Sequence, residues 1–446
     1  MEAVRPINRK ILKLALPNIV SNITIPLLGL VDTALMGHLD NVAYLGAIAL
    51  GSMIFNVIYW SLGFLRMGTV GFTAQALGAD DKKQQLLIFR RGILISLILS
   101  TIIILLHPWI IQLGIDMTRS GEEVKIYAQE YVRIRIWAAP ASLALLVFSG
   151  WFLGMHNAVF PMLIAVFGNI LNIALSYFFV YHLNLNSAGA AWGTVGAQWL
   201  SLGLAIYLFH KKFHYLKRKT TFNELLKINE LTNFFKVNGN IFIRTLGIIF
   251  VISFFTIQSA NIDDYILAIN TILFQFFLFF SFMLDGFANA AEAMTGEYIG
   301  SKSLSKLRLT VRMNMLFGLA FSLIFSAIYF LFGDFIFSLL TSNEEVIQRA
   351  KPLLFWVIIM PPISFAAFIY DGIFIGATAS QALRNGMFIA VVGVFVPIFF
   401  LTPLPEISRL WIAFLSFMAA RGATLALFMK TAVYGQIPSS NDERSG

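Results

Sequence analysis

The stretch SNITIPLLGLVDTALMG, residues 21–37, is apolar enough to lie in membrane hydrocarbon, yet it contains Pro26 and Asp32. A proline removes a backbone hydrogen-bond donor and can kink a helix. A charge at mid-membrane costs at least about 2.5–3.5 kcal/mol, so an acid there faces a bundle interior or a wet cavity. The stretch therefore predicts a membrane-spanning helix that carries a functional acid.

The whole chain has the composition of a membrane protein. Of its 446 residues, 58% are hydrophobic and 12% are charged, whereas soluble domains carry about 25% charged residues. The absence of cysteine excludes disulfides and cysteine-ligated metal sites. The formal charge of +9 comes mostly from basic segments between apolar runs. The positive-inside rule explains such segments, so we expect no nucleic-acid partner.

Twelve apolar segments are long enough to cross a membrane, which takes about 20 residues. The first six are 11–36, 44–70, 88–112, 126–152, 157–182 and 188–210; the last six are 238–259, 265–292, 311–333, 350–372, 383–402 and 408–432. Basic connectors such as DDKKQQLLIFRR (80–91) and HKKFHYLKRK (210–219) predict that these connectors and both termini face the cytoplasm. The sequence thus predicts an all-α, multi-pass membrane protein.

One long polar connector divides the spans into two groups of six. We expect an N-terminal lobe at 1–212, a cytoplasmic linker at 213–237 and a C-terminal lobe at 238–446. Within the linker, ELLKINELTNFF (224–235) has apolar residues at helical spacing, which predicts a short helix on the inner membrane surface. A flexible linker is the alternative.

The two halves resemble each other weakly. The segment YLGAIALGSMIFNVIYW from Tyr44 aligns with YILAINTILFQFFLFFS from Tyr265, and TAQALG (73–78) aligns with TGEYIG (295–300). Six spans in each half give the halves the same orientation, so they should form pseudo-symmetric bundles related by an axis along the membrane normal, as in some transporters. Asp32 lies twelve residues before Tyr44, whereas Ser253 holds that place before Tyr265. The acid therefore belongs to the first half only.

Other polar residues of the first half are expected at the depth of Asp32. Asn172 and Ser176 share one face of the fifth span, and the sixth span brings Thr194 to a similar depth. Such oxygens suit a hard cation or a hydrogen-bonded site for a protonatable acid. Ordinary hydrogen bonding between helices is the alternative. Pro17 and Pro26 are the positions where the first helix can bend.

The second half has a separate polar set on its cytoplasmic side. We expect its members to form an ion-pair cluster that either closes an inner gate or only neutralises charge: Arg244, Asp285, Glu292 and Asp371. Two further residues are candidates for lining a cavity in this half, Gln258 and Asn270. Arg66 and Arg421 have no assigned role.

Several of these motifs together resemble one known family. ALPNIVSNITIPLLGLVDTALMGHL (15–39), GNILNIAL with GAAWGT, and LDGFANAAEA with DGIFIGAT are similar to the multidrug and toxic compound extrusion (MATE) family, and within it to the bacterial DNA-damage-inducible F (DinF) branch. The resemblance implies two six-helix lobes arranged as a V around a central cleft. It also implies a non-enzymatic antiporter of the bacterial inner membrane, expected to be a monomer, which exports bulky, often cationic drug-like compounds.

The resemblance also suggests roles for single residues. It makes Asp32 the ion-coupling residue, assisted by Asn172 and Thr194. Related members often carry a second acid where this chain has Ser176. A single carboxylate is less suited to sodium but can still bind a proton, and burial favours its neutral form. We therefore expect proton coupling and no cofactor, with sodium bound at Asp32, Asn172 and Thr194 as the alternative.

Three other functions compete with efflux. A lipid-linked glycan flippase of the same superfamily needs a cationic groove for pyrophosphate, and the first six spans contain few Arg or Lys residues. A membrane enzyme is disfavoured because the chain has no HExxH or GxSxG motif and its six histidines are scattered. A channel is disfavoured by the duplicated scaffold with a single acid in one half.

Overall fold

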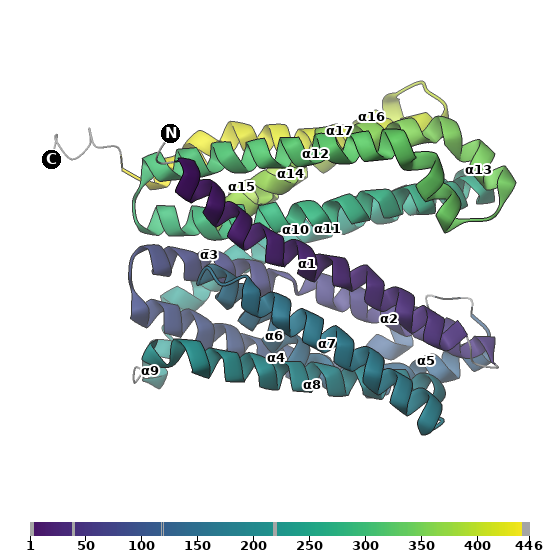
Figure 1. Ribbon diagram of the computed structural model, residues 1–446, viewed down its shortest axis with the longest axis horizontal. Coiled ribbons are helices and arrows are strands. Elements are labelled where there is room, and N and C mark those ends of the chain that lie inside the picture. The colour runs from purple at the N-terminus through teal and green to yellow at the C-terminus, as the bar shows by residue number, and fades with distance from the viewer. Residues whose placement is uncertain (1–3, 38–40, 117, 119, 217–220, 439–446) are drawn as a thin grey trace. The chain divides into compact units, whose positions relative to one another are not determined.

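The computed structural model describes residues 4–37, 41–116, 118, 120–216 and 221–438, apart from the side chains of residues 25–34, 36, 37, 42 and 222. Within these ranges the chain is helical, with short turns between helices and no strand (Figure 1). Its contacts divide it into two compact units. The N-terminal unit comprises the described parts of Val20–Thr73 and Asp81–Phe234. The C-terminal unit comprises those of Met1–Ile19, Ala74–Asp80 and Phe235–Gly446.

The helices follow one another closely along the chain. The first half contains α1 (Val4–Gly37), α2 (Val42–Ser61), α3 (Phe64–Gly78), α4 (Lys82–Asp116), α5 (Glu122–Arg135), α6 (Ala139–Gly154), α7 (Val159–Tyr177), α8 (Asn186–Phe213) and α9 (Phe222–Leu225). The second half contains α10 (Ile228–Ile262), α11 (Asp264–Gly300), α12 (Leu304–Leu340), α13 (Glu344–Ala350), α14 (Leu354–Gly376), α15 (Ser380–Phe388), α16 (Val396–Leu401) and α17 (Glu406–Phe428). Helix α7 continues directly into the π-helical run η2 (Phe178–His182), and α15 continues into the π-helical run η5 (Ile389–Phe395).

The predicted spans match these helices. Among the described residues, ten helical segments are long and apolar enough to cross a membrane. The other two predicted spans lie in α1 and α8, which have 34 and 28 residues and so exceed the roughly 20 residues that a crossing needs. The all-α, multi-pass fold class predicted from the sequence is confirmed.

The internal repeat is visible as matched local geometry. Gly154 of α6 lies against the backbone of α3, and Gly376, which lies 222 residues later, contacts the backbone of α11 in the same way. The two residues that follow these helices with a positive φ, His156 at 56° and Thr378 at 52°, are also 222 residues apart. Small residues allow helix backbones to approach closely. The repeat thus preserves the close helix crossings of each half.

The two matched hexapeptides meet each other inside the C-terminal unit. A side chain on Gly78 would collide with the carbonyl oxygen of Glu297, and one on Gly300 would collide with that of Gln75. Gln75 and Glu297 are both the third residue of their hexapeptide, so the contact is reciprocal. The sequence TAQALG, made in the first half of the chain, therefore packs with the second half.

Helix α1 is shared between the two units. Its residues up to Ile19 belong to the C-terminal unit and those from Val20 to the N-terminal unit. The helix runs without interruption through Pro17 and Pro26. The division falls two residues after Pro17. The lobes proposed from chain order, 1–212 and 238–446, differ from these units in the segments 1–19 and 74–80 and remain a proposal.

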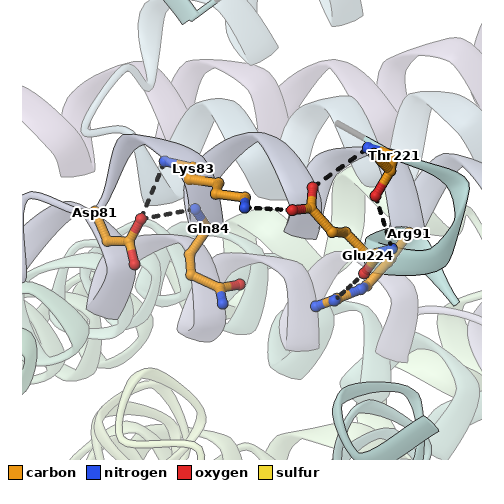
Figure 2. A network of polar contacts seen from close by, with 6 residues as sticks. All are labelled: Asp81, Lys83, Gln84, Arg91, Thr221 and Glu224. Carbon is orange, nitrogen blue, oxygen red and sulfur yellow. Dashed lines mark hydrogen bonds and ion pairs between the residues drawn. The ribbon is translucent and has the colours of Figure 1, made fainter. Parts of the chain in front are cut away.

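The connector between α8 and α10 is attached to α4, as Figure 2 shows. Thr221 and Glu224 form a reciprocal cap at the start of α9, with backbone-to-side-chain distances of 3.3 and 3.4 Å. The Lys83 ammonium donates to Glu224 at 2.5 Å. The guanidinium of Arg91 donates to the carbonyl oxygens of Glu224 and Leu225. The described part of the connector is therefore an ordered element of the N-terminal unit.

The prediction of a single surface helix at residues 224–235 is wrong. Helix α9 ends at Leu225, and residues from Ile228 form the first turns of α10, which continues to Ile262. Apolar residues at helical spacing also fit the polar beginning of a membrane-spanning helix. No proline interrupts the chain between residues 228 and 262, so the helix continues.

Candidate functional site

A stripe of polar side chains follows one face of α7 in the N-terminal unit. Asn169, Asn172 and Ser176 are spaced three and four residues apart, so they lie on the same side of the helix. The Asn172 amide nitrogen donates to the Thr194 hydroxyl on α8 at 3.0 Å. Thr194 donates its own proton to the carbonyl oxygen of Ala190, also at 3.0 Å. The structure thus brings together Asn172 and Thr194, both singled out in the sequence.

Two polar atoms of this stripe have no partner among the described residues. These are Asn172 Oδ1 and Ser176 Oγ, and both are buried. Ser176 is covered because Gly193 of α8 packs directly on it. Because the Thr194 hydroxyl already donates elsewhere, it must accept from Asn172, which orients the amide and leaves Oδ1 as the open acceptor. A buried polar group without a partner costs about 1–3 kcal/mol, so the site is suited to a further group that hydrogen-bonds there.

Helix α1 runs beside α7 and η2, the π-helical run that continues α7, and it is hydrogen-bonded once to each. The Asn169 amide donates to the Thr24 hydroxyl at 2.7 Å, and the Tyr181 hydroxyl donates to the backbone oxygen of Leu35, also at 2.7 Å. The residue numbers increase in the same direction on both helices from the first contact to the second, so α1 and α7 are parallel. At about 1.5 Å per residue, position 32 lies about 12 Å beyond Thr24, and Ser176 about 11 Å beyond Asn169.

The backbone of Asp32 is therefore level with Ser176, and Asn172 lies one helical turn, about 6 Å, before Ser176. The side chains of Asp32 and Pro26 lie outside the described part of the structure, so their contacts are not stated. Pro17 is described and partly buried.

The C-terminal unit contains a cluster of buried charges. The Arg244 guanidinium on α10 donates to Oδ2 of Asp371 on α14. Arg421 on α17 donates to the same oxygen at 2.5 Å. All three side chains are buried. The sequence singled out Arg244 and Asp371 but gave Arg421 no role.

Two acids of α11 complete this cluster. Asp285 interacts electrostatically with both arginines, and Glu292 interacts with Arg244. Glu292 is buried, with 1% of its surface exposed. Two arginines and three acids give the cluster a formal charge of −1. It connects α10, α11, α14 and α17 through charge pairs.

The two residues expected to line a cavity in the second half, Gln258 and Asn270, do not line the same cavity. Asn270 donates to Ser259 at 2.8 Å and accepts from the Trp411 indole at 3.1 Å. It lines a small cavity of about 150 Å³ with Ser259. Gln258 instead accepts from Asn261 at 3.5 Å and is not among the residues that line this cavity. Arg66 of α3 is partly buried, and no role is assigned to it.

The sequence reasoning missed Thr24, Asn169, Tyr181 and Arg421. Asn169 could have been found, because it precedes Asn172 by three residues and continues the same helix face. Arg421 could have been proposed as a partner for three nearby acids of the same half. Thr24 and Tyr181 could not, because a single polar residue in an apolar helix does not identify its neighbour.

Comparison with known proteins agrees with this architecture. The model of the MatE family matches the chain twice, over residues 17–178 and 240–403. The chain is 38% identical over 418 residues to DNA damage-inducible protein F of Escherichia coli K12. The aligned region covers 93% of this chain and 90% of that protein. It is 24% identical to the probable multidrug resistance protein NorM of Thermotoga maritima, over 78% of this chain and 76% of that protein.

Solved structures share the fold. An outward-facing multidrug resistance MATE family transporter of the MOP superfamily superimposes with a TM-score of 0.87 at 21% identity, over 97% of both chains. The Vibrio cholerae MATE transporter VcmN in its bent form gives 0.86 at 18% identity, over 98% of this chain and 99% of that one. Family match, identity and fold agree, and this chain therefore belongs to the MatE family, a family of multidrug efflux transporters.

Proposed function

We propose that the protein exports bulky, often cationic organic compounds in exchange for protons, and that protonation of Asp32 is the coupling step. The observation that carries this proposal is the pair of buried, unpartnered atoms, Asn172 Oδ1 and Ser176 Oγ, of which Ser176 lies level with the backbone of Asp32 and Asn172 one helical turn before it. An acceptor beside a hydroxyl can hydrogen-bond a carboxylic acid when it is protonated and a carboxylate when it is not. The site therefore suits an acid that gains and loses a proton.

Sodium coupling is the second candidate, because all the side chains of the site offer oxygen. A sodium ion needs several oxygens that are free to coordinate it. Thr194 Oγ1 is already engaged in two hydrogen bonds, which leaves it one lone pair. Among the buried, described atoms of the stripe, Asn172 Oδ1 and Ser176 Oγ are the two that lack a partner. This inventory favours a proton.

Coupling requires that proton and substrate favour different conformations. Helix α1 suits this purpose because it belongs to both units and carries Pro17 close to the division between them. We propose that a change of charge at Asp32 alters the outer half of α1, with Pro17 and Pro26 as the positions where it bends. The ion cluster around Asp371 is proposed to fix the C-terminal unit on its cytoplasmic side. A gating role there is the alternative.

The deciding experiment is efflux from proteoliposomes under an imposed pH gradient, with and without a sodium gradient. Wild type should drive uphill efflux with the pH gradient alone. Asp32→Asn should reduce this efflux at least tenfold but leave substrate binding in detergent partly intact. The matched control is Asp334→Asn, which removes an exposed carboxylate from α12 and should keep wild-type rates.

The same assay distinguishes the two ions. Ser176→Asp adds a second carboxylate, which should make efflux more sensitive to sodium if the site is built as proposed. Uphill efflux by Asp32→Asn in a pH gradient would refute Asp32 as the coupling residue. Wild-type efflux that follows only the sodium gradient would establish the second candidate. We also propose that the protein acts as a monomer in the bacterial inner membrane, with both termini in the cytoplasm.

A further inference from the structure

A groove of about 630 Å³ lies on the C-terminal unit, between α10, the run from α15 into η5, and the end of α17. Its volume is typical of a small-molecule site. Its walls are apolar, and six of the side chains that form them are each at least 42% exposed: Ile243, Leu246, Phe250, Phe388, Ile389 and Val392. The groove therefore opens on the surface of its unit as a long apolar trough.

The backbone explains why a trough forms here. Gly247 of α10 has no side chain and lies directly against Met387, so it forms a low floor. On the other wall, α15 passes into the π-helix η5 at Ile389. A π-helical turn displaces side chains from the regular helix positions and is frequent at functional sites. The two features leave space that close-packed helices would fill.

One end of the groove is polar and positively charged. Arg384 lines it beside Asn385. The Arg384 guanidinium donates to Asn240 at 3.1 Å and to Asn385 at 2.9 Å, and Asn240 in turn donates to Ser380 at 3.1 Å. In the part of the chain that the structure describes, no carboxylate pairs with Arg384. A cation is thus held in place by neutral amides, which leaves its charge available to an external anion.

A second cation lies on the α10 face that carries Asn240, outside the residues that line the groove. Lys236 precedes Asn240 by four residues on α10 and is exposed. The length of the groove is also informative. The groove-lining residues of α10 run from Ile243 to Phe250, a rise of about 10 Å. Asn240, which accepts from Arg384 at the charged end, extends this to about 15 Å, half of the 30 Å hydrocarbon thickness of a bilayer. The apolar trough and its charged end together thus match the depth of one lipid leaflet, with the charged end at the level of the headgroups.

We propose that this groove binds an anionic phospholipid, with an acyl chain along the apolar walls and the phosphate at Arg384. In the predicted orientation the charged end faces the cytoplasm, which places the lipid in the inner leaflet. A zwitterionic lipid could fill the trough equally well but carries no net charge to match Arg384 and Lys236. The site should therefore select by headgroup. This inference does not depend on the coupling ion or on the drug-like substrates.

The test is native mass spectrometry of the delipidated full-length protein, titrated with phosphatidylglycerol or phosphatidylcholine of identical acyl chains. Wild type should bind one phosphatidylglycerol about tenfold more tightly, a difference of about 1.4 kcal/mol. Arg384→Gln should abolish this preference. Val392→Trp fills the trough and should weaken both lipids. The charge-matched control is Arg312→Gln, an exposed arginine of α12 outside the groove, which should bind like wild type.

Several results would overturn the proposal. Unchanged preference in Arg384→Gln, or an equal loss in Arg312→Gln, would show that the lipid responds only to overall charge. Displacement of phosphatidylglycerol by excess inorganic phosphate would indicate an anion site without lipid character. Displacement by ethidium, a bulky organic cation, would assign the groove to substrate instead. Wild-type binding by Val392→Trp would exclude the trough as the acyl-chain site, whatever the behaviour of Arg384→Gln.

Discussion

At the scale of single residues, one carboxylate links two arginines of the C-terminal unit. Oδ2 of Asp371 accepts from both Arg244 and Arg421, and all three groups are buried. Replacing a whole buried ion pair with apolar groups can be neutral, whereas removing one partner leaves an uncompensated charge and costs about 3–5 kcal/mol. Asp371 is the shared partner, so its loss affects two charges at once.

Asp371→Ala should therefore destabilise more than Arg244→Met or Arg421→Met alone. We expect a loss of about 3–5 kcal/mol, measured as a lower thermal midpoint and a lower free energy of unfolding in detergent. Adding Arg244→Met to Asp371→Ala should recover part of this loss, because it removes one of the two buried guanidinium groups that have lost their direct hydrogen-bond acceptor. Strictly additive losses would show that the two residues are not energetically coupled. Asp334→Ala, which removes an exposed acid of α12, is the control and should be neutral.

Ser176 offers the opposite case, a buried hydroxyl without a partner among the described residues. Such a group costs about 1–3 kcal/mol, so Ser176→Ala should leave the free energy of unfolding unchanged or raise it. If it serves the coupling site, proton-driven efflux should nevertheless fall several-fold. Thermal unfolding and proteoliposome efflux on the same preparation measure both effects. A large loss of stability with normal efflux would make Ser176 a packing residue.

The polar residues of the site were only partly predictable. Asn172 and Thr194 were found because amides and hydroxyls are conspicuous in apolar helices, and the direction of the spans placed them at similar depth. The hydrogen bond between them, and the two that attach α1 to α7, depend on helix rotation and lateral packing. A pattern of hydrophobic residues does not fix that rotation to within one side chain.

At the scale of helices, the close crossings of the repeat make a sharp stability test. Gly78 and Gly300 each face a backbone carbonyl that a side chain would strike. Gly78→Ala and Gly300→Ala should each destabilise the protein by about 1–3 kcal/mol, as overpacking does. Gly239 of α10 is the matched control, because no atom lies within 4 Å of its added Cβ. Gly239→Ala should be neutral or stabilise slightly.

Thermal midpoints of the three glycine variants would decide the matter. Similar losses in Gly78→Ala and Gly300→Ala would match the reciprocal contact of the two hexapeptides. A loss in only one of them, or an equal loss in Gly239→Ala, would contradict the interpretation that this crossing is tight on both sides.

The apolar spans could be read from the sequence, but the lengths of the helices that contain them could not. Helix α12 extends over 37 residues, whereas its apolar core was predicted at 311–333. Similarly, the basic segment 80–91 was expected as a connector, and most of it forms the start of α4. Lys, Arg and Gln are good helix formers that are excluded from hydrocarbon but not from the helix beyond it. Hydropathy therefore reports the buried length of a helix and not its ends.

At the scale of the whole molecule, the orientation in the membrane follows from the basic connectors. The chain has no cysteine, so single cysteines can be introduced cleanly. Leu185→Cys and Lys212→Cys lie at opposite ends of α8, and both positions are exposed. A membrane-impermeant thiol reagent applied to right-side-out vesicles should label Leu185→Cys. Lys212→Cys should be labelled only after the membrane is opened. Labelling of both from one side would refute the proposed topology.

The sharing of α1 between the two units has a consequence for biosynthesis. Lys10 pairs with Glu297, which lies 287 residues later in the chain, and the turn around Ala15 packs on Gly286. At about 5–20 residues per second, a ribosome needs about 15–60 seconds to cover that distance. The first helix to enter the membrane thus waits for a neighbour made near the end of synthesis. A nascent chain that stops before α11 leaves the first half of α1 without its native neighbour, so Lys10 has no Glu297 to pair with and the turn around Ala15 has no Gly286 to pack on.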